Sequence, residues 1–320
     1  MNKIEFDRTG VDGQTYTQTK IESHFCKNFE RKINNRLGHI TASGSANKMV
    51  CIIKNHLRKL MLASPIQLDY WRVLVDRYRN ILSTMVKYDG VEMRLDKALL
   101  KAFQYDNYRK CKGMQLLAKM LNVKCCPYCN MHYTLYAENK SGKERYAKFQ
   151  FDHFIDKDGY PMFSMSLYNL IPSCGICNNS KKNRVLSLAY HPYHSDIHRN
   201  FYFKVKDELG LLYGNSKTDT FDIELVPNGN KKEFNDYEQA FHLEALYSRH
   251  KDVVKEVYDK AYLAAYYGNE LNFRFIIDDY EYLKRLWLGT YTDEKDIEKR
   301  PLTKLIHDAE QQALESLLIE

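Results

Sequence analysis

Two Cys-x-x-Cys pairs constrain this chain more than any other feature of its sequence. They are Cys126-Pro-Tyr-Cys129 and Cys174-Gly-Ile-Cys177, which we call the first and the second knuckle. Two thiolates from one tight turn can bind the same ion, and two such turns complete the tetrahedral site that zinc prefers. We therefore expect a structural zinc ion bound by all four cysteines.

Other uses of these cysteines stay open on the sequence alone. One Cys-x-x-Cys pair is also typical of a redox site, although in a cytosolic chain such pairs more often bind metal. Cys125 can replace Cys126 as a ligand, but the two-residue spacer favours Cys126. Four cysteine ligands leave no open position on zinc, so we expect this ion to stabilise the fold and to take no part in chemistry.

The apolar residues are not gathered into a membrane segment. The sequence has no apolar run of about 18 residues, the length that reads as a membrane span. Its start, MNKIEFDRTGVDG, lacks the apolar stretch of a secretory signal. Hydrophobic residues are 44% and charged residues 28% of the chain, as in globular proteins. We expect a cytoplasmic protein without a membrane partner.

The spacing of apolar residues predicts a mostly helical protein with a few strands. Residues 46–121, and the chain from about 235 to its end, carry apolar residues at helical intervals. Other stretches alternate or are rich in residues that favour strands: 131–138, 145–154, 167–172 and 200–230. A further helix is expected just after the second knuckle.

The positive charge of the chain is concentrated in its middle third. Residues 101–200 contain 15 lysines and arginines against 7 acidic residues, whereas the rest of the chain contains 33 against 34. The net charge of +7 therefore comes from the segment that holds the knuckles. This pattern favours a polyanionic partner, although a solvated basic face without a partner gives the same count.

Residues between and just after the knuckles are suited to metal-assisted chemistry on a phosphate. Asp152 offers an oxygen ligand to a hard divalent ion, and Asn178 can offer another. His153 is the usual type of general base near neutral pH, and Asn169 can hold its imidazole in position. Neighbours on a strand point to opposite faces, but at a strand end both can reach one site. Basic residues that can contact phosphates follow: Lys181, Lys182 and Arg184.

This constellation resembles the HNH endonuclease family, in particular the zinc-supported branch of the ββα-metal nucleases. The matching segment covers less than a fifth of the chain. Its residues occur in the family's order: Cys126-x-x-Cys129, Asp152-His153, Pro161, Asn169-Leu170, Cys174-x-x-Cys177-Asn178 and Lys181. Each part alone is a weak signal, and their order makes the pattern specific.

The resemblance implies a metal-dependent endonuclease that hydrolyses DNA. His153 is then the base that activates water, and Asn169 orients His153 or its loop. Asp152 and Asn178 bind one Mg²⁺ or Mn²⁺ ion, which contacts the scissile phosphate and stabilises the leaving oxygen. Many family members have His at the position of Asn178, so a soft metal is less suited here.

The resemblance also implies an architecture. We predict an α+β, mostly helical fold, with a central zinc-stabilised ββα-metal (HNH) nuclease core between N- and C-terminal helical regions. The three predicted parts are an N-terminal helical region (1–122), the nuclease core (123–190) and a C-terminal region of short strands followed by helices (191–320).

The segments that flank the motif resemble those of larger nucleases. HPYH (191–194) and YSRHKDVVKEV (247–257) are similar to segments of bacterial defence nucleases, including the HNH partner of an ATPase in Septu-type anti-phage systems. This similarity implies antiviral defence, an ATPase partner, and phage or other foreign DNA as the target.

Two other functions fit the same sequence. A zinc-ribbon module can bind nucleic acid or protein without cutting, but it has no need for the combination of Asp152, His153 and Asn178. An RNase can use the same catalytic site, because nothing in the sequence indicates whether a 2′-hydroxyl is recognised.

Overall fold

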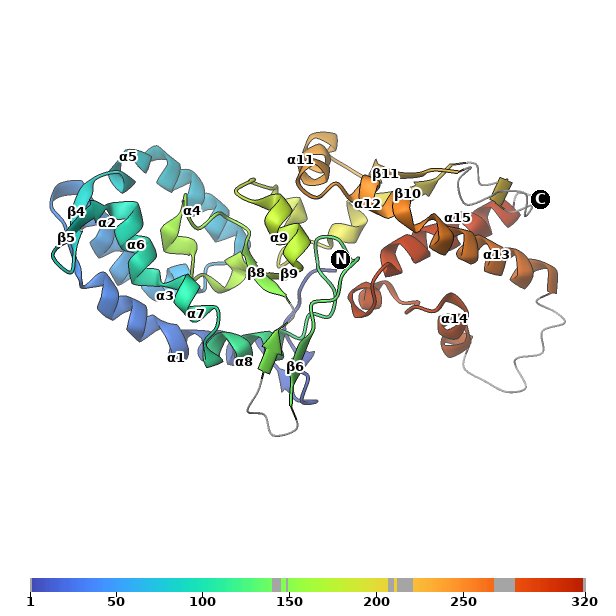
Figure 1. The fold of residues 1–320 in the computed structure, drawn as a ribbon, viewed down its shortest axis with the longest axis horizontal. Helices are drawn as coiled ribbons and strands as arrows, with labels where there is room; N and C mark the ends of the chain where they lie inside the picture. The colour runs from blue at the N-terminus through green and yellow to red at the C-terminus, as the bar shows by residue number, and fades with distance from the viewer. Residues whose placement is uncertain are drawn as a thin grey trace. The chain divides into compact units, whose positions relative to one another are not determined.

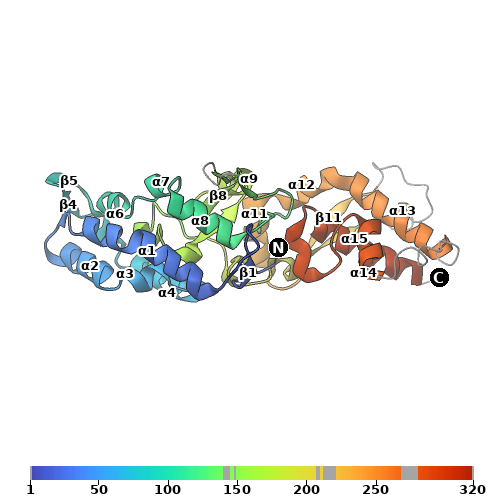
Figure 2. The same cartoon turned by 90° about the horizontal axis from the view of Figure 1, so that it is seen from below.

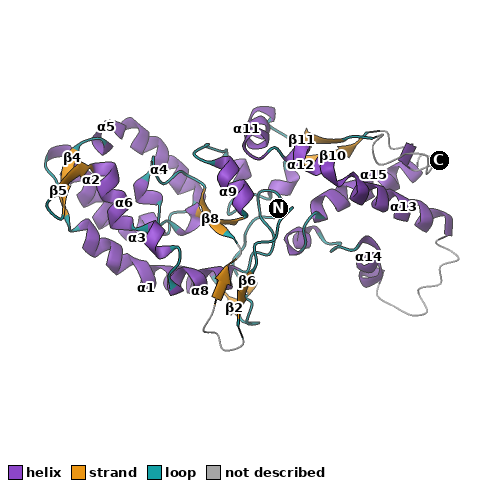
Figure 3. Cartoon of the chain, viewed as in Figure 1, coloured by secondary structure: helices purple, strands orange, loops and turns teal. Residues whose placement is uncertain are grey.

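The computed structural model describes residues 2–139, 145–147, 149–206, 210–211, 221–267 and 280–318. The chain divides into two compact units that are interleaved in sequence. The N-terminal unit consists of Ile4–Val123 and Thr134–His194. The C-terminal unit consists of Met1–Lys3, Lys124–Tyr133 and Ser195–Glu320. Helices predominate in both, with small sheets, as the α+β prediction requires (Figure 3). The three-part division at 122 and 190 stays a prediction.

The elements of the N-terminal unit lie between Ile4 and His194. Its helices are α1 (Gln18–Leu37), α2 (Gly44–Asn55), α3 (Leu57–Met61), α4 (Pro65–Arg77), α5 (Arg79–Leu82), α6 (Leu95–Phe103), α7 (Tyr105–Tyr108), α8 (Lys112–Leu121) and α9 (Gly175–Lys181). Its strands are β1 (Arg8–Thr9), β2 (Thr15–Tyr16), β3 (Ile40–Thr41), β4 (Met85–Tyr88), β5 (Val91–Arg94), β6 (Tyr136–Glu138), β7 (Arg145–Ala147), β8 (Gln150–His153) and β9 (Leu170–Ser173). It also has the 3₁₀ turns η1 (Pro161–Phe163), η2 (Leu167–Asn169) and η3 (Leu188–Tyr190).

The core of the N-terminal unit forms around α1. Thr17 caps this helix by accepting a hydrogen bond from the Lys20 amide at 3.3 Å. The buried face of α1 repeats at helical spacing: Ile21, Phe25, Phe29, Ile33 and Leu37. This face packs along α6 and α8 (Figure 2). The predicted helical character of residues 46–121 is confirmed for α2 to α4 and α6 to α8.

A three-stranded sheet interrupts the stretch that the apolar spacing predicts as helix. β4 and β5 form an antiparallel hairpin, and β3 pairs with β4. Asp89 and Gly90 join the hairpin with φ angles of 49° and 81°. Such a pair of positive φ angles is typical of a two-residue hairpin turn, which Asp-Gly strongly favours. The helical prediction for these residues is therefore wrong, and Asp89-Gly90 is the signal that corrects it.

The strands near the knuckles are shorter than their sequence pattern suggests. β6 pairs with β7, and β8 pairs with β9, both in antiparallel register. The predicted strand 145–154 is therefore two strands with different partners, and Lys148 between them lies outside the described residues.

The C-terminal unit is a hairpin packed against helices. Its elements are η4 (Ile197–Arg199), β10 (Phe201–Val205), β11 (Ile223–Pro227), α11 (Lys231–Phe241), α12 (Leu243–Tyr247), η5 (Ser248–His250), α13 (Lys251–Tyr267), α14 (Tyr280–Leu288), η7 (Glu294–Lys299) and α15 (Thr303–Leu318). β10 and β11 pair antiparallel over five residues, which confirms the predicted small sheet. Parts of the predicted C-terminal region lie outside the described residues: 207–209, 212–220, 268–279 and 319–320.

Side chains of α15 satisfy the backbone of β10 along its outer edge. The Asp308 carboxylate accepts a hydrogen bond from the Phe203 amide at 2.8 Å, and the Gln312 side chain bonds to both Val205 and Phe203. A strand edge covered in this way is not available for pairing with another chain.

No helix among the described residues has the length and apolar composition needed to cross a membrane.

Candidate active site and metal centre

The segment with the predicted catalytic residues folds as two strands followed by a helix, within the N-terminal unit. β8 and β9 pair in antiparallel register, with Asp152 and His153 opposite the first two residues of β9. α9 follows β9 directly and packs on β8 (Figure 1). The sulfur of Cys174 caps α9 by accepting a hydrogen bond from the Cys177 amide at 3.4 Å. The strand, loop, strand and helix therefore occur in the order that the sequence predicts.

One face of β8 lies against α9. Gln150 and Asp152 are two residues apart and share a face of the strand, whereas Asn178 and Lys181 are three apart and share a face of the helix. The Nδ2 of Asn178 donates a hydrogen bond to Oε1 of Gln150, and Nζ of Lys181 lies 3.3 Å from Oδ2 of Asp152. The two predicted metal ligands, Asp152 and Asn178, therefore lie on facing surfaces of β8 and α9.

Lys181 is the counter-ion of Asp152. Its side chain is fully buried, and Nζ also donates a hydrogen bond to the His153 carbonyl at 2.7 Å. A buried ammonium requires a partner of opposite charge, which Asp152 supplies. Lys182 and Arg184, in contrast, are exposed. Of the three residues predicted to contact phosphates, Lys181 is buried and Lys182 and Arg184 are exposed.

The imidazole of His153, the last residue of β8, contacts Tyr105 and the loop that follows the strand. Its Nε2 lies 3.0 Å from the Ser164 carbonyl, and its ring stands edge-on to Tyr105 at 4.3 Å between centroids. Because a carbonyl oxygen only accepts, Nε2 carries the proton, and Nδ1 keeps its lone pair. Burial lowers the pKa of His153 to about 4, so the ring is neutral at pH 7.

Asn169 ties together the loop that joins β8 to β9, residues 154–169. Its Oδ1 accepts a hydrogen bond from the Ile155 amide at 2.7 Å. Its Nδ2 donates to the carbonyls of Ile155 and Phe163, each at 3.0 Å. Phe163 precedes Ser164, whose carbonyl holds His153. Of the two roles predicted for Asn169, these bonds correspond to orienting the loop.

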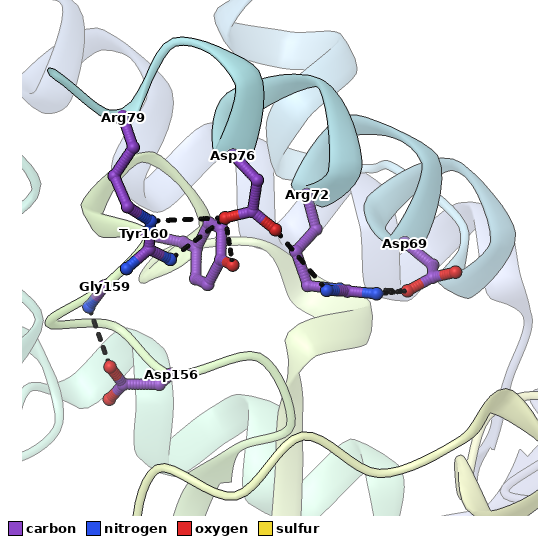
Figure 4. A network of polar contacts seen from close by, with 7 residues as sticks. All are labelled: Asp69, Arg72, Asp76, Arg79, Asp156, Gly159 and Tyr160. Atoms are coloured by element: carbon purple, nitrogen blue, oxygen red, sulfur yellow. Dashed lines mark hydrogen bonds and ion pairs between the residues drawn. The ribbon is translucent and has the colours of Figure 1, made fainter. Parts of the chain in front are cut away.

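Residues of α4 and α5 also contact the loop 154–169. The Tyr160 hydroxyl donates a hydrogen bond to Oδ1 of Asp76 at 2.6 Å, and Arg79 donates two to the same oxygen (Figure 4). The Arg79 guanidinium also lies over the Tyr160 ring at 5.0 Å. Within the loop, the Gly159 amide donates to Asp156 at 2.7 Å. The position of the Ser164 carbonyl is therefore fixed by contacts on several sides.

Tyr105 and Ser164 contribute to the site but were not predicted from the sequence. Besides facing His153, Tyr105 donates a hydrogen bond from its hydroxyl to the Phe151 carbonyl at 2.9 Å, which fixes β8 to α7. Ser164 acts through its backbone carbonyl, which any residue type can provide. Neither position therefore carries a recognisable sequence signal.

The chemistry of Asp152 and Asn178 fits a hard divalent cation. A carboxylate and an amide oxygen are the ligand types that Mg²⁺ and Mn²⁺ accept, together with water. The Lys181 ammonium occupies the Oδ2 side of Asp152 and competes electrostatically with a cation there. A metal ion at this place would therefore bind beside a fixed positive charge.

The four knuckle cysteines come together as the sequence predicts. The sulfurs of Cys126, Cys129, Cys174 and Cys177 all lie within 4.8 Å of one another, and all four residues are buried. Cys125 is not part of this group. Burial raises the pKa of its thiol to about 12, so it is protonated at pH 7. The buried four-cysteine group can hold a structural zinc ion.

The first knuckle is anchored within the C-terminal unit. The Tyr237 and Tyr247 hydroxyls donate hydrogen bonds to the carbonyls of Tyr128 and Cys129. Asn130, with a φ of 50°, follows the knuckle, and its side chain bonds the Ile297 carbonyl at 2.8 Å. These contacts fix the backbone that carries both sulfurs of this knuckle.

Comparisons with known proteins do not identify the chain: no family model matches it, and neither curated proteins nor solved structures give a significant match.

Proposed function

We propose that the protein is a metal-dependent endonuclease of the HNH type that hydrolyses phosphodiester bonds of DNA. The observation that carries this proposal is the hydrogen bond from His153 Nε2 to the Ser164 carbonyl, within a ββα arrangement. This bond fixes the tautomer in which Nδ1 is the acceptor, and burial keeps the ring neutral. A neutral imidazole with a fixed acceptor nitrogen is what a general base requires.

The proposed cofactor is Mg²⁺ or Mn²⁺, held by the Asp152 carboxylate and the amide oxygen of Asn178. When bound, such an ion stabilises charge on a phosphoryl oxygen and on the leaving oxygen. The Nδ2 of Asn178 donates a hydrogen bond to Gln150, so the Oδ1 of Asn178 is the atom proposed to bind the metal ion. Asn169 acts as a positioning residue, because its bonds are to the loop that carries Ser164.

DNA is the proposed substrate because of the charge around the site. Lys182 and Arg184 are exposed immediately after α9, and residues 101–200 carry the entire positive excess of the chain. Exposed lysine and arginine side chains contact phosphates without reading the base sequence. We further propose a role in bacterial defence with an ATPase partner, which rests only on the resemblance of the flanking segments. RNA cleavage by the same site remains an alternative.

A binding module without catalysis is the second candidate, and one observation favours it. Asp152 and Lys181 form a buried ion pair, so the carboxylate already has a partner of opposite charge. A purely structural role for this pair needs no metal at Asp152. The protein would then bind a polyanion through Lys182 and Arg184, beside the zinc-supported knuckles, without cutting it.

Incubation of the purified protein with supercoiled plasmid and with RNA distinguishes these functions. The proposal predicts nicked or linear DNA with Mg²⁺ or Mn²⁺ and intact DNA with EDTA. An Asn178→Ala variant, which leaves the buried pair of Asp152 and Lys181 intact, is expected to bind DNA as the wild type does and to lose metal-dependent cutting. Binding of DNA without cutting by any sample, in either metal, would instead support the binding module.

A further inference from the structure

An apolar cavity of about 610 Å³ opens in the N-terminal unit. α2, α3, α4 and α5 line it together with η1. Its apolar wall includes Met49, Ile52, Trp71, Leu74, Ile81 and Met162. The volume lies in the range of small-molecule sites in proteins, roughly 300–1,000 Å³. Two residues of the wall are largely exposed to solvent: Ile52 is 61% and Tyr78 is 57% exposed.

The polar groups of the cavity are all basic or neutral. Lys48, Lys59 and His56 line it together with Ser45, and no acidic residue is found among its described lining residues. Lys48 lies on α2 and Lys59 on α3, so the two ammonium groups come from different elements. An occupant that carries an anionic group would therefore be attracted at its head while its apolar body is removed from water.

We propose that this cavity binds a small amphipathic anion: an organic molecule with an apolar body and one anionic group such as a carboxylate. The size of the cavity favours a small molecule, because its volume lies within the range of small-molecule sites. The basic, acid-free lining selects an anion over a neutral or cationic molecule of the same size. This inference does not depend on the proposed nuclease activity.

A molecule bound in the cavity would contact the loop that holds His153. Met162 and Phe163 form part of its wall, and both belong to the loop 154–169. The Phe163 carbonyl accepts a hydrogen bond from Asn169, and the next carbonyl, that of Ser164, holds His153. A ligand in the cavity would therefore touch the segment on which the orientation of His153 depends.

Trp71 offers a direct reporter for this binding. The chain has two tryptophans, Trp71 and Trp287, so a Trp287→Phe variant leaves Trp71 as the single tryptophan, which is excited selectively over tyrosine at long wavelength. Decanoate, kept below its micelle-forming concentration, is the probe, and decyltrimethylammonium is the matched cation. The proposal predicts a saturable blue shift of Trp71 emission with decanoate, with half-saturation at a concentration about fivefold or more below that of the cation.

Two sets of variants in the same background test the charge contribution. Lys48→Gln with Lys59→Gln is expected to weaken decanoate binding about fivefold or more, whereas Lys54→Gln, on α2 but outside the cavity lining, leaves it unchanged. All three lysines are exposed, so the variants are expected to fold, and circular dichroism verifies this. An emission shift that fails to saturate, equal responses to the two probes, or an unaffected double variant would each overturn the proposal.

Discussion

Among single residues, Lys181 departs furthest from what its sequence context suggests. It stands in a basic run with Lys182 and Arg184, which predicts three phosphate contacts, yet it is buried against Asp152. α9 has only seven residues, too few for an apolar periodicity to show which side faces the strand. The spacing of Asn178 and Lys181 does predict that they share a helix face, and the structure places that face on β8.

The buried ion pair makes a sharp prediction for stability. Lys181→Met leaves the Asp152 carboxylate buried without its partner, which is expected to lower the free energy of unfolding by about 3 kcal/mol. Lys182→Met, one residue further and exposed, is the matched control and is expected to change it by less than about 0.5 kcal/mol. Urea denaturation of both variants gives the comparison. Equal stability of the two would contradict the counter-ion role of Lys181.

His191 is a second buried residue with a measurable consequence. Burial, and to a lesser extent the neighbouring His194, lowers its pKa to about 3, while its ring packs on Phe154 at 4.1 Å between centroids. The unfolded chain therefore takes up a proton near pH 6.5, where the folded protein does not. Stability should fall as the pH drops from about 6.5 toward 3.

Unfolding of the wild type and of His191→Gln at a series of pH values tests this expectation. The variant should be less stable near neutral pH but should lose less stability on acidification. If the two proteins respond identically to acid between pH 6.5 and pH 4, His191 does not carry the effect.

At the scale of elements, the sequence predicts the order of the ββα segment but not its details. Alternation in 145–154 indicates extended backbone, yet it cannot show that β7 and β8 pair with different partners. The hairpin of β4 and β5 was missed because helical spacing of apolar residues outweighed Asp89-Gly90, the stronger local signal. Some of the contacts that fix the 154–169 loop come from α4 and α5, far away in sequence, and no local pattern predicts these.

The Asn169→Asp variant tests how much the stability of the 154–169 loop depends on the Asn169 side chain. In Asn169→Asp the carboxylate still accepts from the Ile155 amide but can no longer donate to the Ile155 and Phe163 carbonyls. The expected loss is about 2 kcal/mol in the free energy of unfolding, with faster amide hydrogen exchange across the loop. Asn179→Asp, at an exposed position of α9, is the control and should behave as the wild type. Unchanged exchange in the loop of Asn169→Asp would refute its tying role.

At the scale of the whole molecule, the sequence predicts the four-cysteine group correctly because the ligand spacing itself carries the signal. It does not predict two interleaved compact units, since that division depends on contacts between distant segments. The first knuckle illustrates this, because Tyr237 and Tyr247 hold it from more than a hundred residues away. Tyrosine is common throughout the chain, and nothing local marks these two.

The metal content of the purified protein tests the four-cysteine group. We expect about one zinc ion per chain and a lower unfolding temperature after removal by a chelator, because structural zinc contributes to folding. Cys174→Ser should lose the zinc, whereas Cys125→Ser, next to a ligand but outside the group, should keep it. Elemental analysis measures the zinc content of both variants. Equal zinc in the two would contradict binding of the ion by the four-cysteine group.

Plasmid cleavage by wild type and His153→Ala, with DNA binding measured on the same samples, tests the central claim most directly. The account predicts cleavage by the wild type in Mg²⁺ or Mn²⁺, and a rate about 100-fold or more lower in His153→Ala with DNA binding unchanged. Cleavage by His153→Ala at the rate of the wild type would contradict the assignment of His153 as the general base.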